Sequence, residues 1–328
     1  MSLDEQRERT ILLMILGSIS IHAEPQKDQV GQMQVNCCQI CQSQVGISHP
    51  VREMMLGTRD EFLYWECSDC GCLSLTAVPT DLGKYYPGDY YSLQIRTPKL
   101  LRKIRDHLYL SRLSFLVNWR KRTDLDVIRR IGLKKNMALL DVGCGSGTLL
   151  ADLRELGYNA RGVDPFVPCD IRDRFGVRVE RKTLAEVDSK FDVILFRHSL
   201  EHMPINMLGM VTKHLKRSGL CVVCIPVLGW AWRSYTTDWA QLDAPRHFFL
   251  HSRKSFSLLA EKSGFRIERV VYDSNEFQFW ASESYQRDIP LSKMLEPNKS
   301  QLRRMRRLAK SLNSQEQGDT AQFYLRPA

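Results

Sequence analysis

Hydrophobic positions in the second half of the chain alternate between short apolar runs and helical patterns. Helices are predicted near residues 148–156, 167–174, 203–217 and 252–263. Runs typical of buried strands occupy Ala138–Val142, Ala160–Val163, Val177–Glu180, Phe191–Phe196, Leu220–Ile225, Phe265–Tyr272 and Glu276–Ala281. Strands that alternate with helices indicate a parallel sheet with right-handed crossovers. The pattern therefore predicts a doubly wound, mostly parallel seven-stranded α/β domain over residues 124–283, whose last two strands form a hairpin.

The segments outside this domain differ from it in composition. Residues 1–32 are a predicted extension without a clear role, and their acidic residues argue against a signal peptide. Residues 33–95 contain clustered cysteines, residues 96–123 form a predicted basic helical linker, and residues 284–328 read as a basic, mobile tail. The net charge of +10 lies mainly in residues 96–130, with eleven basic against three acidic side chains, and in residues 287–328, with nine against four. The body of the protein is therefore not basic.

Two Cys-x-x-Cys pairs mark the N-terminal module. Cys38 and Cys41 form one pair, and Cys67 and Cys70 form the other after an intervening predicted strand. Each pair can place two thiolates on one turn, so the four predict a structural zinc site of the zinc-ribbon kind. Cys37 and Cys72 compete as ligands. Such spacing predicts reduced thiols and a cytoplasmic protein.

Cys221 and Cys224 repeat the same spacing inside an apolar strand. Successive side chains of a strand point to opposite faces, so these two thiols cannot share a metal ion. They are predicted core residues.

A glycine-rich turn follows the first predicted strand of the α/β domain. The run from Leu139 to Leu149 contains Asp-x-Gly-x-Gly-x-Gly, from Asp141 to Gly147. Such a turn lets the backbone approach a ligand at the carboxyl end of the sheet. A dinucleotide loop would need its third glycine at residue 148, which is Thr. The pattern instead resembles motif I of the class I methyltransferases that use S-adenosylmethionine (SAM).

This resemblance implies a set of SAM-binding residues. Asp141 and Gly143 would line the methionine end, and the Thr183–Leu184 stretch would line the adenine. Asp164, seventeen residues after Gly147, can accept hydrogen bonds from ribose hydroxyls of either NAD or SAM, so it does not choose between them. The full implied set is Asp141, Gly143, Cys144, Gly145, Gly147, Asp164, Thr183, Leu184 and Arg197.

Histidines gather where the acceptor would lie. The fourth predicted strand runs into His198, Glu201 and His202, at the sheet edge that faces the cofactor. After the fifth strand, an insertion rich in aromatic residues, which we interpret as a lid, leads to His247. A hydroxyl acceptor requires a base with a pKa near 7, which favours histidine. The candidate bases are therefore His247 and His202, followed by His198.

The histidine segments resemble a bacterial group of methyltransferases with an N-terminal zinc module, many of which act in polysaccharide, deoxysugar and secondary-metabolite biosynthesis. The sugar C-methyltransferases among them share a His before Ile/Met-Pro, matched by His202, and a His-Phe-Phe-Leu-x-Ser segment whose His is the base, matched by His247. Their acidic residue before that His is Arg246 here, a nearby Tyr is missing, and residues 283–328 are too few for their C-terminal domain. These departures favour transfer to oxygen over carbon.

The sequence therefore predicts a SAM-dependent methyltransferase for the oxygen of a sugar, nucleotide-sugar, glycan or related small metabolite. The basic helices point to an anionic acceptor such as a phosphate-linked sugar. An RNA methyltransferase with a zinc ribbon is the main alternative, although neither an Asn/Asp-Pro-Pro-aromatic signature nor an RNA-binding module is found. Sugar C-methylation and a non-catalytic module that docks on membranes or partners are further alternatives.

Overall fold

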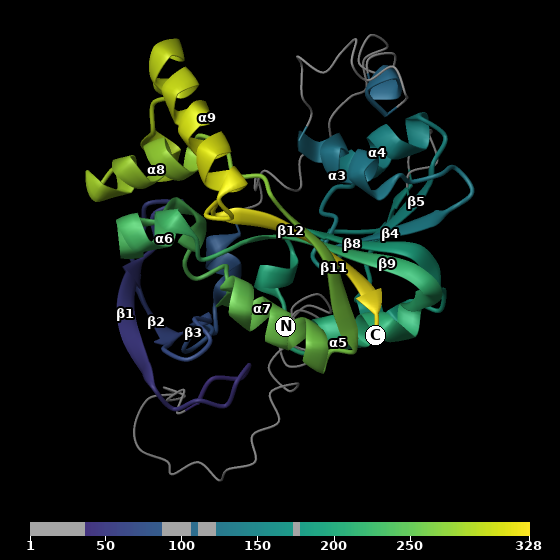
Figure 1. The fold of residues 1–328 in the computed structure, drawn as a ribbon, viewed down its shortest axis with the longest axis horizontal. Helices are drawn as coiled ribbons and strands as arrows, with labels where there is room; N and C mark the ends of the chain where they lie inside the picture. Colours follow the sequence, from purple (N-terminus) through teal and green to yellow (C-terminus); the bar gives the residue numbers. More distant parts are fainter. Residues whose placement is uncertain (1–36, 87–105, 111–122, 173–177) are drawn as a thin grey trace.

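A computed structural model describes residues 37–86, 106–110, 123–172 and 178–328. The predictions for residues 1–32 and for most of the linker 96–123 lie outside the described residues. The described chain folds around two sheets, a large α/β sheet and a small sheet that holds the cysteine module (Figure 1).

The large sheet confirms the predicted α/β class. Its strand order is β11-β12-β9-β8-β4-β5-β7-β6. Strands β7, β5, β4, β8 and β9 are mutually parallel, whereas β12 runs antiparallel between β9 and β11. The two-residue β6 adds an eighth, antiparallel edge to seven main strands. The strands are β4 (Ala138–Val142), β5 (Asn159–Val163), β6 (Ile171–Arg172), β7 (Arg178–Glu180), β8 (Phe191–Arg197), β9 (Leu215–Pro226), β11 (Phe265–Tyr272) and β12 (Thr320–Pro327).

Helices cover both faces of this sheet. They are α3 (Thr123–Ile131), α4 (Thr148–Glu155), α5 (Met207–His214) and α7 (Arg253–Lys262). The helices α3 and α4 lie on one face, and α5 and α7 lie on the other (Figure 1). Consistent with this, Cys221 is buried in the cluster that includes α5 and α7, whereas Cys224 is buried in the cluster that includes α3 and α4. These two cysteines are core residues on opposite faces, as predicted.

The seventh strand is not the one predicted. Residues 277–281 lie in the helix α8 (Phe277–Gln286), which follows its N-cap residue Glu276, and the Asn275 side chain accepts the N–H of Phe277 at 2.8 Å. The strand beside β9 is β12, at the end of the chain. Between α8 and β12 lies α9 (Lys299–Ser314). The prediction of a mobile tail is therefore wrong, because hydrogen bonds to β9 and β11 hold β12 inside the sheet.

Two other helix predictions also change. No helix forms at 167–170, and residues 171–172 form β6 instead. Pro168 explains this, because proline lacks an N–H and restricts the residue before it. The helix predicted at 203–217 is the shorter α5, because the chain already pairs with β8 at Leu215.

The small sheet joins the cysteine module to the insertion after β9. It contains β1 (Gly46–Arg52), β2 (Glu61–Cys67), β3 (Leu73–Leu75) and β10 (Phe249–Leu250), all antiparallel. The insertion also contains α6 (Trp230–Tyr235), and its side chains Trp232, Tyr235 and Trp239 are buried against the module. The aromatic insertion is therefore packed against the cysteine module. This burial argues against the lid that the sequence predicted.

Candidate active site

The glycine turn after β4 is shaped by its backbone. Gly143, Gly145 and Gly147 all have positive φ, between 54° and 77°. This is a conformation that other residues rarely adopt. A Cβ on Gly143 would lie 2.5 Å from Cβ of Ser199, so the turn is in direct contact with the segment after β8. The sequence therefore brings the glycine turn and the histidine-bearing segment together at the carboxyl ends of neighbouring strands.

Asp164 lies at the end of β5, next to the same turn. Its carboxylate accepts the N–H groups of Gly145 and Phe166, each at 2.9 Å. Burial raises its pKa above the ordinary value for an aspartate. Each carboxylate oxygen can accept a second hydrogen bond. Asp164 can thus hold the glycine turn and still accept a ligand hydroxyl.

Asp141 is a buried acid beneath the glycine turn, and one of its carboxylate oxygens is unpaired among the described residues. It is buried at the end of β4, and its Oδ1 has no hydrogen-bond partner in the described part of the chain. Burial raises its pKa to about 7, and the positive charge of Arg197 acts in the opposite direction. An unpaired buried acceptor is costly, and it can be satisfied by a cationic or N–H-donating ligand.

The remaining cofactor candidates lie close to this core. The Cys144 thiol is half-buried in the glycine turn. Leu184 is buried in the same cluster as Val142 and Val163, while Thr183 caps its short helix and pairs with Glu186. The structure thus brings Leu184 to the sheet edge that carries the glycine turn.

His202 and His247 form a pair whose rings lie 4.7 Å apart. Nδ1 of His202 lies 2.8 Å from the carbonyl oxygen of Arg246, and Nδ1 of His247 lies 2.8 Å from that of Gln241. A carbonyl oxygen can only accept, so each Nδ1 atom carries a proton, and the lone pair of a neutral ring lies on Nε2. The candidate His198 is different, since half of its side chain is exposed and it lies at the edge of the group.

Two carboxylates flank this pair, the buried Glu201 and the partly buried Asp243, and Asp243 was not predicted from the sequence. The Nε2 atom of His247 lies 4.0 Å from Oε1 of Glu201 and 3.8 Å from Oδ2 of Asp243. Glu201 is 1% exposed, and neither of its oxygens has a hydrogen-bond partner within the described residues. Its position next to His202 in the chain was visible, but its inward orientation comes from the 3-10 turn at Leu200–His202.

Burial keeps His247 neutral despite the two nearby carboxylates. Burial, followed by the nearby His202, lowers the pKa of His247 to about 4. Burial acts to raise the pKa of Glu201, but the three surrounding histidines outweigh it and hold that pKa below the ordinary value. At neutral pH, His247 is therefore uncharged beside an ionised Glu201. A proton that arrives at Nε2 would lie between two negative charges.

The guanidinium of Arg246 binds carboxylates and does not contact the histidine rings. Its side chain is fully buried and pairs with Glu53 at 2.9 Å and with Asp243 at 2.5 Å. Burial acts to lower the pKa of the guanidinium, but the two carboxylates outweigh it and raise that pKa, so Arg246 stays charged. Arg246 and Glu53 are 193 positions apart, so no local signal in the sequence could have identified this ion pair.

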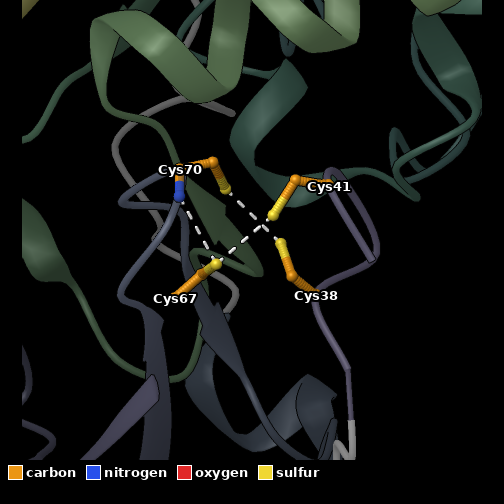
Figure 2. A group of neighbouring side chains, drawn as sticks. All are labelled: Cys38, Cys41, Cys67 and Cys70. Atoms are coloured by element: carbon orange, nitrogen blue, oxygen red, sulfur yellow. Dashed lines mark hydrogen bonds between the residues drawn. The ribbon is translucent and has the colours of Figure 1, made fainter. Parts of the chain in front are cut away.

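The four predicted zinc ligands come together in the module (Figure 2). The sulfur atoms of Cys38, Cys41, Cys67 and Cys70 all lie within 4.8 Å of one another. Two of the sulfur–sulfur distances are 3.4 and 3.5 Å, near the edge of about 3.8 Å that a tetrahedron of thiolates around zinc would have. Cys37 and Cys72 lie outside this group, so the geometry favours the predicted quartet.

Comparisons with known proteins agree with this description. Residues 116–270 match the family model described as a methyltransferase domain. A ubiquinone biosynthesis O-methyltransferase from Azorhizobium caulinodans is 36% identical over 80 residues, which are 21% of this chain and 31% of that protein. The chain thus matches less than a third of that relative's length.

Two solved structures are similar at low identity. The geranyl diphosphate C-methyltransferase from Streptomyces coelicolor A3(2) is 13% identical, over 74% of this chain and 88% of that chain, with a TM-score of 0.45. A SAM-dependent methyltransferase from Archaeoglobus fulgidus is 18% identical, over 66% and 98%, with a TM-score of 0.40. Residues 116–270, which match the methyltransferase domain, carry the glycine turn and the parallel strands β4, β5, β7, β8 and β9 of the large sheet. In the described residues, no helix is long and apolar enough to cross a membrane.

Proposed function

We propose that this protein transfers the methyl group of SAM to an oxygen atom of a small acceptor, with His247 as the general base. The observation that carries this proposal is the state of His247. Its imidazole is neutral, its Nδ1–H is tied to the Gln241 carbonyl, and its Nε2 lone pair lies beside Glu201 and Asp243. This group is joined to the glycine turn through the contact between Ser199 and Gly143.

These positions give separate roles to the residues of the glycine turn and to the histidine pair. SAM supplies a methyl group that its sulfonium already activates. Asp141, Asp164 and the glycine turn would hold the cofactor, while His247 would take the proton of the acceptor hydroxyl. Glu201 and Asp243 would then stabilise the imidazolium, because opposite charges within about 4 Å favour the charged form.

The choice of oxygen is supported by Arg246. In the resembling sugar C-methyltransferases an acid precedes the base, whereas here that position holds a guanidinium locked between two carboxylates. Arg246 therefore offers no group that can exchange protons at neutral pH. The curated relative is also named as an O-methyltransferase. We propose a sugar, nucleotide-sugar, glycan or related metabolite as the acceptor, from the resemblance at His202 and His247, and a phosphate-linked sugar as its anionic form.

We further propose a structural zinc ion at Cys38, Cys41, Cys67 and Cys70. Four thiolates would fill a tetrahedral site, which leaves no position for a substrate. Reduced thiols of this kind fit a cytoplasmic protein, which is the location we propose.

A kinetic comparison tests the base. His247→Asn should lower turnover on the order of 100-fold or more while SAM affinity stays within about two-fold of wild type. His198→Asn is the matched control, since that side chain is half exposed, and we expect it to change turnover less than His247→Asn does. Near-normal turnover of His247→Asn would remove His247 as the base.

Metal analysis of the same samples tests whether the histidine pair binds a metal ion instead. Glu201, His202 and His247 each offer a ligand atom within 4.8 Å of the others. One equivalent of metal that depends only on the four cysteines is the expected result. A second equivalent that disappears in His247→Asn would identify the histidines as metal ligands and overturn the proposed base.

A further inference from the structure

The histidine pair is attached to the cysteine module by a continuous set of hydrogen bonds. Strand β10, directly after His247, pairs with β3 of the module. The Tyr64 hydroxyl on β2 donates to the carbonyl oxygen of His247 at 2.7 Å, and the N–H of Leu75 donates to that of Phe248 at 2.9 Å. The module is therefore part of the structure that holds the base.

Arg246 is the point where these contacts converge. Its guanidinium is held by Glu53 of the module and by Asp243, and it also donates to the Tyr85 carbonyl at 3.2 Å. Glu53 is itself fixed, because its carboxylate accepts three backbone N–H groups from the turn after β1 (Leu56, Gly57 and Thr58). A largely buried ion group of this kind contributes little to stability compared with apolar packing. Its geometry is thus the feature that needs an explanation.

The same residue reaches both histidines. The carbonyl oxygen of Arg246 accepts Nδ1–H of His202, which fixes the ring and its tautomer. The guanidinium binds Oδ1 of Asp243, whose Oδ2 lies 3.8 Å from Nε2 of His247. Arg246 thereby orients Asp243 toward the base and also offsets its negative charge.

We propose that Arg246 is a positioning residue through which the cysteine module holds the histidine pair and offsets the negative charge of Asp243 beside His247. This inference rests on the proposed role of His247. The charged or titratable groups around that imidazole are Glu201 and His202 from the turn after β8, Asp243 and Arg246 from its own segment, and Tyr64 from β2. Arg246 provides the permanent positive charge in this set.

These charges determine how the pKa of His247 would change if Arg246 were removed. Without Arg246, the negative charge of Asp243 would act on His247 without an opposing charge, and the imidazolium would be stabilised. The pKa of His247 would then rise, and the base would stay protonated up to a higher pH. Because the loss of Arg246 alone would leave the buried carboxylate of Glu53 without its ion pair, the informative variant is the double change Glu53→Gln with Arg246→Met.

The experiment follows the imidazole directly by NMR titration of the full-length protein. In the double variant we expect the midpoint of His247 to rise by about one pH unit or more. We also expect the acid limb of the pH–rate profile to move upward by the same amount, with SAM affinity within about two-fold of wild type. Asp288→Asn is the matched control, because Asp288 pairs with Arg52 and Arg59 of the module away from the histidines. This control should leave midpoint and turnover unchanged.

Two outcomes would separate this inference from the proposed function. A His247 midpoint that stays unchanged in the double variant, whatever happens to stability, would show that Arg246 only holds the fold together. The titration needs no acceptor, so it decides this point even if wild type methylates nothing that is offered. Failure of wild type to methylate any acceptor, with a shifted midpoint, would contradict the proposed function and leave the positioning role of Arg246 intact.

Discussion

The contact between Gly143 and Ser199 allows a quantitative prediction. Replacement of Gly143 by alanine keeps φ at 72°, which costs about 1–2 kcal/mol for a residue with a Cβ. The new methyl group would also lie 2.5 Å from Cβ of Ser199. Ser199 cannot move away easily, because it is buried and its hydroxyl donates to the Val142 carbonyl at 2.6 Å.

The two contributions can be separated by a matched control. Overpacking of this kind costs about 1–3 kcal/mol. Gly143→Ala should therefore lower the free energy of unfolding by roughly 2–5 kcal/mol in total. Gly132 has a similar φ of 65° but open space around its Cα, so Gly132→Ala should lose only the strain of about 1–2 kcal/mol. The difference between the variants measures the clash.

Urea unfolding followed by circular dichroism gives these free energies, and calorimetric titration gives the affinity for SAM. Gly143→Ala should weaken SAM binding, whereas Gly132→Ala should not. Adding Ser199→Gly, which removes the Cβ that clashes, should recover part of the stability lost in Gly143→Ala. Equal losses in Gly143→Ala and Gly132→Ala would refute the claim that the glycine turn is packed against the histidine-bearing segment.

Three further predictions concern separate parts of the molecule. Asp164→Ala should weaken SAM binding at least 10-fold, because the carboxylate also holds the N–H of Gly145 in the glycine turn. Unchanged affinity in a calorimetric titration would exclude Asp164 from the cofactor site. Burial raises the pKa of Asp319 to about 6. Its contribution to the free energy of unfolding, at most about 3 kcal/mol, is therefore fully present below the unfolded pKa of about 3.8 and is lost as the pH rises through 6. Asp319→Asn keeps an acceptor for the indole N–H of Trp239 and should be more stable than wild type in urea at pH 8 but not at pH 4; equal differences at both pH values would contradict the shift. Cys41→Ser should lower the bound metal measured by mass spectrometry, whereas Cys37→Ser should not, and the reverse result would reassign the ligands.

The parts of the fold that the sequence predicts well are those with local causes. The glycine turn is recognisable because Gly143, Gly145 and Gly147 are required by their own backbone conformations. The strands β4, β5, β8 and β9 carry enough apolar residues to be recognised alone. The cysteine quartet follows from two tight turns. In each case the signal lies within a few residues of the feature that it predicts.

The failures have non-local causes. Residues 276–281 alternate like a strand, yet Phe277, Ala281 and Tyr285 also match a helix, and packing decides for α8. Strand β12 becomes the seventh strand because it pairs with β9, about a hundred positions earlier. The partners of the histidine pair depend on even larger separations, since Glu53 and Arg246 lie 193 positions apart in the sequence. Such pairings are set by tertiary structure and leave no trace in a single sequence.

The central claim is that the chain methylates a small acceptor with SAM, and transfer of labelled methyl tests it most directly. Purified wild type and His247→Asn would be incubated with labelled SAM and either a pool of nucleotide sugars and glycan precursors or total RNA. Label in the sugar pool with wild type, and its loss with His247→Asn, is the predicted result. Label in RNA, or equal labelling by both proteins, would contradict it.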